Sequence, residues 1–494
     1  MTNISWISIY SVLSVFVHIL GIANAAHAVM KVKSSRSAIA WSISLISLPW
    51  VVIPLYWLLG KSKFHGYSEA LTTAYAKHQE LVQEARSELL QHKAHLPPQF
   101  ATLENLTDRF AALPFTTHNT LELLIDGQQT YQSMLAAIAA AKNYILFQSY
   151  IIKSDDIGNQ FKNAFIAKAQ QGVRVYLLYD GLGSMKLPRD YIEDLRQAGV
   201  VVSSFRSSKG KNSRFQLNFR NHRKILVIDG RTGFVGGLNI GDEYLGKDPH
   251  LGEWRDTHTK IQGPAVTCLQ TILLGDWYWA TRDVLDVNWD IDDRLLEQQP
   301  DESGQTTFIL SSGPADSLQV CSLFFLNLIN QAQERLWIAS PYFVPDGTTL
   351  NALKLAAIRG VDVRIILPTR PDQKLVYFCS FSYYDSLRQV GIQVYRHRPG
   401  FMHQKVILCD HAITGVGTVN LDNRSFFLNF EVMAFAINHG QSSGPESTDF
   451  IQSVEKMLEN DLAASRLVDL SSYQQKPIWF KLAARASRLL SPIL

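Results

Sequence analysis

The feature that most constrains this chain is a segment that occurs twice, with the two copies about 180 residues apart. Both copies follow the pattern H-x-K-x-x-x-x-D, and the matching residues are His222, Lys224 and Asp229 in one copy and His403, Lys405 and Asp410 in the other. In each copy the His and the Lys open an apolar, β-branched run, and the two-residue period of a strand puts both side chains on one face. Two such copies predict two structural repeats with one composite site, where both histidines and both lysines converge on a phosphate.

The copies also agree beyond the Asp, where a glycine and an asparagine follow at the same spacing. These segments are Gly236-Gly237-Leu238-Asn239 and Gly417-Thr418-Val419-Asn420. We expect Asn239, Asn420 and Thr418 to hold phosphoryl oxygens. The Asp has the opposite parity from the Lys and lies beside a turn, so we expect it to complete the catalytic motif by fixing the strand end. A single H-x-K is typical of an ordinary core or loop histidine, whereas two full copies make that interpretation improbable.

The flanking sequence predicts an α/β fold that is built twice. A strand at 144–152, a helix at 159–171 and a strand at 173–179 form a β-α-β unit, and the same order recurs at 336–342, 348–359 and 361–367. Strands that alternate with helices form sheets covered on both faces, so we predict two α/β/α sandwich repeats packed face to face. A chain of 494 residues is also too long for one ordinary core.

Two apolar stretches near the N-terminus, at 6–30 and 39–60, are each about as long as a membrane-spanning helix. Basic residues lie between them at 31, 33 and 36, and we predict a two-helix transmembrane hairpin. A cleaved signal peptide is the competing interpretation, but no basic residue precedes Trp6 and a second apolar stretch follows at once. The orientation stays open, because Lys61 and Lys63 nearly balance the basic loop.

These features divide the chain into six predicted segments. They are a transmembrane hairpin at 1–66, a juxtamembrane helical linker at 67–119, a first half at 120–285, a linker at 286–305, a second half at 306–478 and an amphipathic tail at 479–494. The tail sets Lys481, Arg485 and Arg488 among aromatic and aliphatic residues. Two interpretations of the tail stay open: a helix that packs on the fold, and a helix that lies in the lipid interface.

The composition disfavours several kinds of site. A net charge of +3 gives no bias towards polyanions, so we expect no nucleic-acid partner. The four cysteines form no C-x-x-C pair, no G-x-x-x-x-G-K-[ST] loop occurs, and no carboxylate cluster indicates a metal, so we expect neither metal nor cofactor. A basic run precedes the first motif and is expected to be a solvated loop or to hold anionic headgroups; it consists of Lys209, Lys211, Arg214, Arg220 and Arg223.

The two motifs supply the groups that break a phosphodiester without a metal. One His attacks phosphorus and forms a phosphohistidine, while the other protonates the leaving alcohol and later deprotonates the incoming one; we favour His222 as the nucleophile. Lys224, Lys405 and the two asparagines neutralise the non-bridging oxygens. Each imidazole also needs a partner on its second nitrogen, and Asp256 and Glu431, at matched strand starts in the two halves, are the candidates.

The doubled motif resembles the signature of the phospholipase D superfamily, and four further segments look like those of bacterial cardiolipin synthases of the phospholipase D type. These segments are 236–246, 254–258, 340–345 and 417–426. The resemblance covers nearly the whole chain and implies two phospholipase D-like halves in a multi-pass enzyme of the bacterial cytoplasmic (inner) membrane. It also implies the reaction of such a phosphatidyltransferase, in which two molecules of phosphatidylglycerol give cardiolipin and glycerol, with membrane phospholipids as partners. Gly237 departs from the superfamily pattern, since Thr418 stands at its place in the second copy, and this predicts an asymmetric site.

Other functions share the same catalytic residues. A phospholipase D-type hydrolase, or a transphosphatidylase that uses another lipid such as phosphatidylethanolamine, differs only in which molecules enter and leave. A nucleic-acid phosphodiesterase is disfavoured by the near-neutral charge and the apolar stretches. A membrane scaffold with an inactive enzyme fold is disfavoured because both histidines and both lysines are present.

Overall fold

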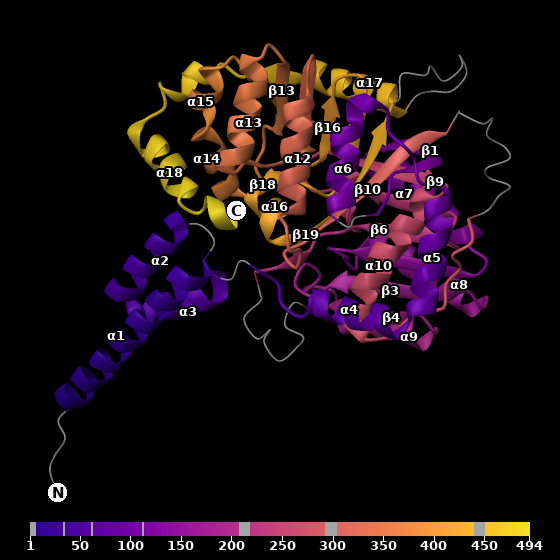
Figure 1. The fold of residues 1–494 in the computed structure, drawn as a ribbon, viewed down its shortest axis with the longest axis horizontal. Helices are drawn as coiled ribbons and strands as arrows, with labels where there is room; N and C mark the ends of the chain where they lie inside the picture. Colours follow the sequence, from indigo (N-terminus) through magenta and orange to yellow (C-terminus); the bar gives the residue numbers. More distant parts are fainter. Residues whose placement is uncertain are drawn as a thin grey trace, which may run out of the picture. The chain divides into compact units, whose positions relative to one another are not determined.

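The computed structural model describes residues 6–32, 35–60, 63–110, 113–206, 218–291, 304–438 and 450–494 (Figure 1). It forms two compact units, one of Met1–Tyr67 with Ser207–Phe219 and one of Ser68–Arg206 with Arg220–Leu494. Several predictions fall outside the described residues: those for Lys33 and Lys61, for Lys209, Lys211 and Arg214 in the basic run, and for 292–303 in the linker between the halves.

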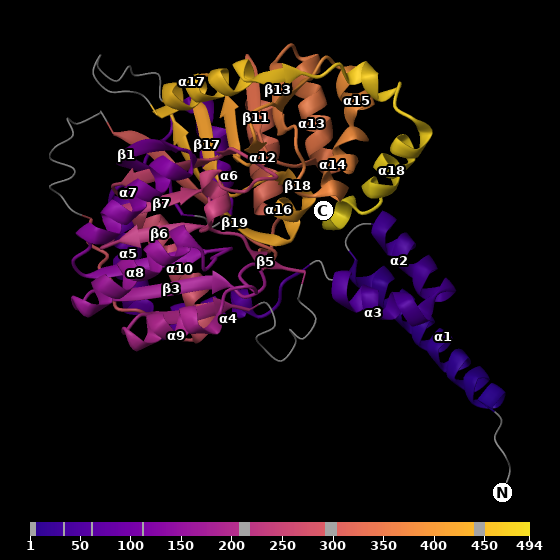
Figure 2. The same cartoon turned by 180° about the vertical axis from the view of Figure 1, so that it is seen from behind.

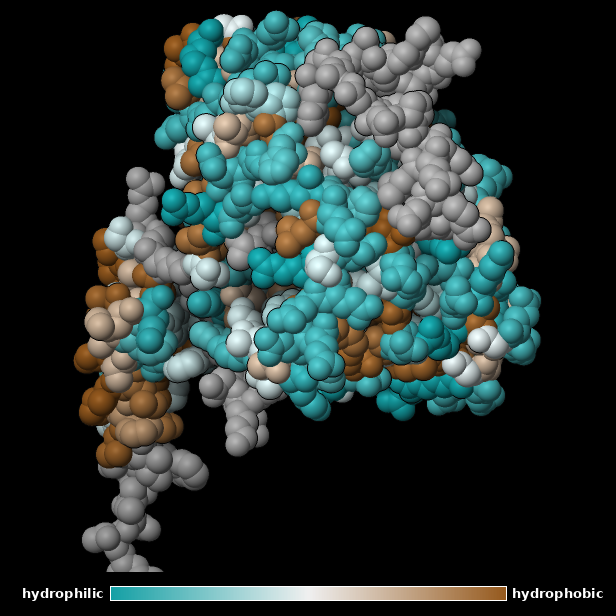
Figure 3. Space-filling model, turned by 45° about the vertical axis from the view of Figure 1, so that its right-hand side comes forward, coloured by the Kyte–Doolittle hydropathy of each residue, from teal (hydrophilic) through white to brown (hydrophobic). Residues whose placement is uncertain are grey.

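Among the described residues of the smaller unit, one helix is long and apolar enough to cross a membrane, α1 (Trp6–Lys31). Its exposed side chains include Val12, Phe16 and Ile19, and the N-terminal helices have a hydrophobic surface, brown in Figure 3. A helix needs about 20 apolar residues to span the hydrocarbon core of a bilayer, and α1 has that length.

The second predicted span is not one helix. Helix α2 (Ser35–Ser47) ends before Leu48, and α3 (Pro49–Leu59) begins anew. Proline lacks the N–H that a continuing helix needs but fits the first turn of a new one, so Pro49 separates the two helices. Each piece is shorter than a bilayer-spanning helix, and the predicted two-helix hairpin is therefore not confirmed.

The larger unit contains one strand order twice. The strands of the first half are β1 (Thr116–Ile125), β2 (Tyr144–Ser149), β3 (Arg174–Asp180), β4 (Val201–Phe205), β6 (Ile225–Ile228), β7 (Thr232–Gly236) and β9 (Thr257–Gln262). Those of the second half are β10 (Gln305–Ser312), β11 (Arg335–Ala339), β13 (Asp362–Pro368), β14 (Gln393–His397), β16 (Val406–Cys409), β17 (Ile413–Gly417) and β19 (Asn429–Ile437). The first half has the order β4-β3-β2-β6-β7-β9-β1 and the second has the order β14-β13-β11-β16-β17-β19-β10, with β20 (Ser465–Leu467) added at its edge. In both halves the first three strands are parallel and the others antiparallel, as expected for a repeated β-α-β unit.

Helices cover both faces of these strands (Figure 2). Those of the first half are α7 (Asp126–Ala140), α8 (Asp156–Gln170), α9 (Arg189–Gln197) and α10 (Ala265–Thr281). Those of the second half are α12 (Val320–Gln331), α13 (Gly347–Ile358), α14 (Lys374–Phe381), α15 (Tyr384–Arg388), α16 (Asn423–Phe427), α17 (Phe450–Ala463) and α18 (Ile478–Arg488). In β11, Leu336 and Ile338 belong to one buried cluster while Trp337 and Ala339 belong to another, so both faces of this strand are buried. The predicted α/β class and its repeated units are confirmed.

The two halves join through β1. The beginning of this ten-residue strand pairs with β10, Thr116 opposite Thr307, and its remainder pairs with β9, Thr120 opposite Gln262. The side chain of Asn119 spans the change of register, because its Nδ2 donates to the carbonyl oxygens of Thr116 and Gln305. The halves therefore form one continuous sheet, joined edge to edge. This corrects the prediction of two sandwiches packed face to face. The halves share a sheet because β1 is long enough to pair with β10 of the second half and with β9 of the first.

The region predicted as a juxtamembrane helical linker, 67–119, contains several helices. It contains α4 (Tyr67–Lys77), α5 (Gln79–Gln91) and α6 (Ala101–Arg109). Beyond α5, Ala94, Leu96, Phe100 and Leu103 pack in the core that also holds α12. Much of this region is thus part of the folded unit and not a spacer.

Candidate active site

Two short parallel pairings between the halves position the histidines. Strand β5 (Arg220–Asn221) lies beside the start of β19, and β15 (Phe401–Met402) lies beside β8 (Trp254–Arg255). The N–H of His222 donates to the carbonyl oxygen of Phe430 (2.9 Å), and the N–H of His403 donates to that of Arg255 (2.8 Å). Each motif therefore starts against a strand of the other half.

Each histidine also faces a carboxylate of the other half. His222 Nδ1 lies 2.9 Å from Glu431 Oε2 and 3.1 Å from Glu431 Oε1, and His403 Nδ1 lies 2.9 Å from Asp256 Oδ2. Both carboxylates are fully buried. An ionised carboxylate can only accept hydrogen bonds, so Nδ1 carries the proton in each ring and Nε2 is the reactive nitrogen. The structure thus brings both predicted partners to the histidines and shows that the pairing crosses between the halves.

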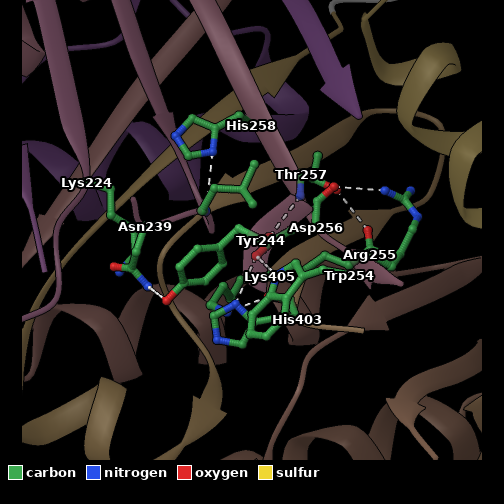
Figure 4. A network of polar contacts seen from close by, with 12 residues as sticks. Lys224, Asn239, Tyr244, Trp254, Arg255, Asp256, Thr257, His258, His403 and Lys405 are labelled. Atoms are coloured by element: carbon green, nitrogen blue, oxygen red, sulfur yellow. Dashed lines mark hydrogen bonds and ion pairs between the residues drawn. The ribbon is translucent and has the colours of Figure 1, made fainter. Parts of the chain in front are cut away.

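The two lysines lie beneath the histidines of their own copies. Lys224 Nζ donates to the carbonyl oxygen of His222 (2.7 Å), and Lys405 Nζ donates to that of His403. Lys405 Nζ is also 2.9 Å from His403 Nδ1. Figure 4 shows Lys405 and His403 in one network of polar contacts with Asp256. Both lysines are buried, and their charge is available to an anion that enters the site.

Burial controls the protonation of this site. It lowers the pKa of His222 to about 4 and that of His403 to about 3. It also lowers the pKa of Lys224 to about 7 and that of Lys405 to about 8. Lys405 contributes to the low pKa of His222, and Lys224 contributes to that of His403, so the two motifs are close enough to interact electrostatically. Both imidazoles are therefore neutral at pH 7 when no anion is bound.

The pKa values of the two buried carboxylates are lowered by their neighbours, against the effect of burial. Burial alone would raise the pKa of Glu431, but the nearby His222 holds it below its ordinary value, and Lys224 acts in the same direction. Burial would likewise raise the pKa of Asp256, which His403 and Lys405 hold below its ordinary value. Both carboxylates are ionised at neutral pH and are ready to stabilise positive charge on an imidazole.

The two motif aspartates connect strands. Asp229, after β6, accepts hydrogen bonds from the N–H groups of residues 142–144, where β2 begins. Asp410, after β16, accepts them from residues 333–335, where β11 begins. Both aspartates have a φ of 53°, in the left-handed region. This geometry agrees with the expectation that they fix strand ends.

The three side chains predicted to bind phosphate differ in their hydrogen-bond partners. Asn239 donates to Tyr244 Oη (2.8 Å) and accepts from the N–H of Ile151 (3.2 Å). The hydroxyl of Thr418 donates to the carbonyl oxygen of Val432 (3.0 Å) and accepts from its N–H (2.9 Å). Asn420 Oδ1 is buried and has no hydrogen-bond partner among the described residues. Asn420 is thus the one of the three with an unused polar atom, but Oδ1 is an acceptor, and only its Nδ2 can donate to a phosphoryl oxygen.

The glycine that departs from the repeat has a steric cause. A Cβ at Gly237 would lie 2.0 Å from Asp256 Oδ1. In the second half, Thr418 stands at the matching place, and its hydroxyl helps to keep the pKa of Glu431 low. The two histidines therefore have different surroundings: His403 faces a short carboxylate beside a glycine, and His222 faces a longer one beside a hydroxyl.

Two aromatic residues beside the histidines were not predicted as site residues. The ring of Tyr150 lies 5.1 Å from that of His222, with Lys224 Nζ 5.4 Å from the Tyr150 ring centre. The ring of Trp254 lies 5.1 Å from that of His403, and its Nε1 donates to Asp256 Oδ2 (3.2 Å). Tyr150 directly follows β2, and the carboxyl ends of parallel strands commonly form ligand sites. Its position after β2 is therefore the feature of the sequence that could have identified Tyr150 as a site residue.

The middle residue of each motif is anchored to a helix. Arg223 donates to the buried Asp276 of α10 (2.7 Å), and Gln404 donates to Asp461 of α17 (2.6 Å). Arg223 is itself buried, which corrects its assignment to a solvated or headgroup-binding basic run. A guanidinium is buried there because the ion pair and three further acceptors satisfy its donors.

Comparison with known proteins gives a consistent result. The family model described as cardiolipin synthase, phospholipase D-like domain, matches residues 134–249 and 325–462. The chain is 41% identical to cardiolipin synthase A of Pseudomonas fluorescens (strain Pf-5), over 98% of each chain. It is also 41% identical to cardiolipin synthase A of Pseudomonas aeruginosa, over 100% of this chain and 97% of that one. Among solved structures, a phosphatidylserine synthase from Haemophilus influenzae has a similar fold, with a TM-score of 0.58 and 16% identity over 79% of this chain and 99% of that one.

Proposed function

Because this chain belongs to the family of cardiolipin synthases with phospholipase D-like domains, we propose that it is a phosphatidyltransferase that makes cardiolipin. Two molecules of phosphatidylglycerol react, and the products are cardiolipin and glycerol. The observation that carries the proposal is the exchange of carboxylates between the halves: Glu431 holds His222 and Asp256 holds His403, so the two motifs form one site.

In the first step, His222 Nε2 attacks the phosphorus of one phosphatidylglycerol. The bond from phosphorus to the glycerol headgroup breaks, and His403 gives its proton to the departing oxygen, so that glycerol leaves. We assign the attack to His222 because its Nδ1 lies within 3.1 Å of both oxygens of Glu431, whereas Nδ1 of His403 lies 2.9 Å from one oxygen of Asp256.

In the second step, the terminal headgroup hydroxyl of another phosphatidylglycerol gives its proton to His403. Its oxygen attacks phosphorus, the bond to His222 breaks, and cardiolipin is released. In both steps Lys224, Lys405 and Nδ2 of Asn420 stabilise the non-bridging oxygens. The anionic phosphodiester also raises the pKa of His403, which must be protonated before the first step although it is neutral in the empty site.

The protein is attached to a membrane through α1. We place it in the cytoplasmic membrane of a bacterium, with α2 and α3 as a second, broken arm of the hairpin. Ile43, Ile46 and Leu48 are exposed and apolar, which supports contact of this arm with lipid. An enzyme held at lipid meets two lipid substrates more often than water-soluble polyanions, and we expect no nucleic-acid substrate.

The proposal is tested by the products that the purified full chain makes from labelled phosphatidylglycerol in vesicles, with a chelator present. Cardiolipin with an equal amount of free glycerol, both absent in His403→Ala, supports the proposal. Phosphatidic acid as the main product would identify a hydrolase. Product that forms only when phosphatidylethanolamine is added would identify a different donor.

A further inference from the structure

The C-terminal helix α18 (Ile478–Arg488) packs one face against the fold and exposes the opposite face to solvent. Its Phe480 packs against Phe378 and Phe381 of α14, with ring centres 5.3 and 5.1 Å apart, and Ala484 and Ser487 are buried. On the opposite face, Ile478, Leu482 and Leu489 are 83, 68 and 82% exposed. Residues 478, 482 and 489 share one side of a helix and form an apolar stripe, with Arg485 at its edge between 482 and 489.

The residues on the two sides of this stripe are of the types that proteins place at a membrane interface, namely tryptophan and basic residues. Trp479, which is 62% exposed, lies on one side of it. Lys481 and Arg488 lie on the other side, and Arg485 lies between them and the stripe. No acidic residue occurs between Leu470 and the C-terminus, which keeps the whole segment basic. A helix with an apolar stripe, a basic flank and a tryptophan at the border is suited to the surface of an anionic bilayer.

The helix is held in a fixed place close to the candidate active site. After α18, the carbonyl oxygens of residues 491, 493 and 494 accept hydrogen bonds from Asn423 and Arg424 in α16. Figures 1 and 2 both show α18 and the C-terminus beside α14 and α16. Arg424 is near enough to Tyr150 to influence its pKa, and Tyr150 contacts His222. The segment that follows α18 is thus connected through Arg424 and Tyr150 to the surroundings of His222.

We propose that α18 is a second membrane-binding element, which lies in the headgroup layer of an anionic bilayer and brings the catalytic unit against the lipid surface. The occupant is a lipid surface and not a protein partner, because the basic flank matches anionic headgroups and the stripe is one residue wide. The proposal concerns attachment and does not depend on the reaction that the site performs.

The test measures the depth of one side chain in the full chain reconstituted in vesicles. The four native cysteines are buried and free, so a nitroxide label can be placed on Leu482→Cys. Ile358→Cys in α13, with Ile358 67% exposed, is the matched control from the same half. Collisions of each label with dioxygen, which concentrates in lipid, are compared with collisions with a water-soluble nickel chelate.

In vesicles that contain phosphatidylglycerol, the label at 482 should collide more with dioxygen than with the nickel chelate, and the label at 358 should show the reverse. Arg485→Gln should reduce the depth at 482. Equal behaviour of the two labels would overturn the proposal. A label at 482 shielded from both reagents would also overturn it, because that result indicates a protein contact. Unchanged thermal unfolding of each labelled variant ensures that the fold is intact.

Discussion

Nδ1 of His222 lies 2.9 Å from Oε2 of Glu431, a residue 209 positions later in the chain. The reciprocal contact, from His403 to Asp256, spans 147 positions. Neither copy of the motif is therefore complete alone, since each receives its carboxylate from the other half. This exchange explains why one chain carries both copies: the site exists only where the halves meet.

Replacing either carboxylate by its amide should impair catalysis without unfolding the protein. Glu431→Gln and Asp256→Asn keep the shape of the side chain but remove the charge that stabilises a positively charged imidazole. We expect kcat to fall about 10²- to 10⁴-fold in each variant. The measurement is the rate of cardiolipin formation, with thermal unfolding as the control. A variant with full activity would mean that its carboxylate does not orient the histidine.

Gly237→Ala should damage the site through Asp256. The new Cβ would lie 2.0 Å from Asp256 Oδ1, so the carboxylate must move away from His403. We expect a destabilisation of about 1–3 kcal/mol together with a loss of activity.

The matched control for this substitution is Gly347→Ala, at the start of α13, where a Cβ meets nothing within 4 Å. It should leave activity unchanged and stabilise the fold slightly. If Gly237→Ala behaves like this control, Asp256 can relax without consequence and the steric account fails.

The sequence predicts the local parts of this structure well. The β-α-β units at 144–179 and 336–367 appear within a few residues of their predicted bounds, because their apolar runs are long and periodic. The carboxylate exchange is not predictable in the same way. It depends on β5 and β8, strands of two residues each, which are too short to carry any periodic signal.

The other differences between the predicted and the observed structure each depend on one or two residues. Pro49 interrupts an apolar stretch whose composition alone resembles a single span. Arg223 belongs to a basic run by sequence, yet it is buried because its partner Asp276 lies 53 positions away on α10. Tyr150 gives no motif signal, and only its place after a parallel strand indicates a role.

Asp410 should matter for stability more than for chemistry. Asp410→Ala removes an acceptor shared by three backbone N–H groups and places alanine at a φ of 53°. We expect a loss of about 1–3 kcal/mol in the free energy of unfolding, measured with urea. Asp410→Asn should lose less, because asparagine keeps one acceptor oxygen and tolerates the left-handed region. A folded Asp410→Asn protein without activity would instead assign this residue to the reaction.

Binding of an oxyanion should draw protons from solution. In the empty site the pKa of Lys224 is about 7 and that of Lys405 about 8, both lowered by burial. At pH 8 Lys224 is therefore mostly neutral and Lys405 is partly so. A bound anion favours the charged forms and raises both pKa values, so the two lysines together should take up about one proton at pH 8 and fewer at pH 6, in addition to the proton that His403 takes up.

The measurement is calorimetry with tungstate, performed in two buffers that differ in ionisation enthalpy. Lys224→Met and Lys405→Met should each reduce the uptake. A binding enthalpy that does not depend on the buffer at pH 8 would show that both lysines are already charged in the empty site.

The most direct test of the account is whether a phosphatidyl group becomes attached to His222. A phosphatidyl ester of p-nitrophenol needs no acid for its leaving group, so His403→Ala should still react once with it. The account predicts a burst of nitrophenolate in this variant, with a phosphatidyl adduct on the peptide that contains His222 and slow release afterwards. His222→Ala should give neither burst nor adduct. An adduct on His403 with His222→Ala, or the absence of any adduct in His403→Ala, would contradict the account.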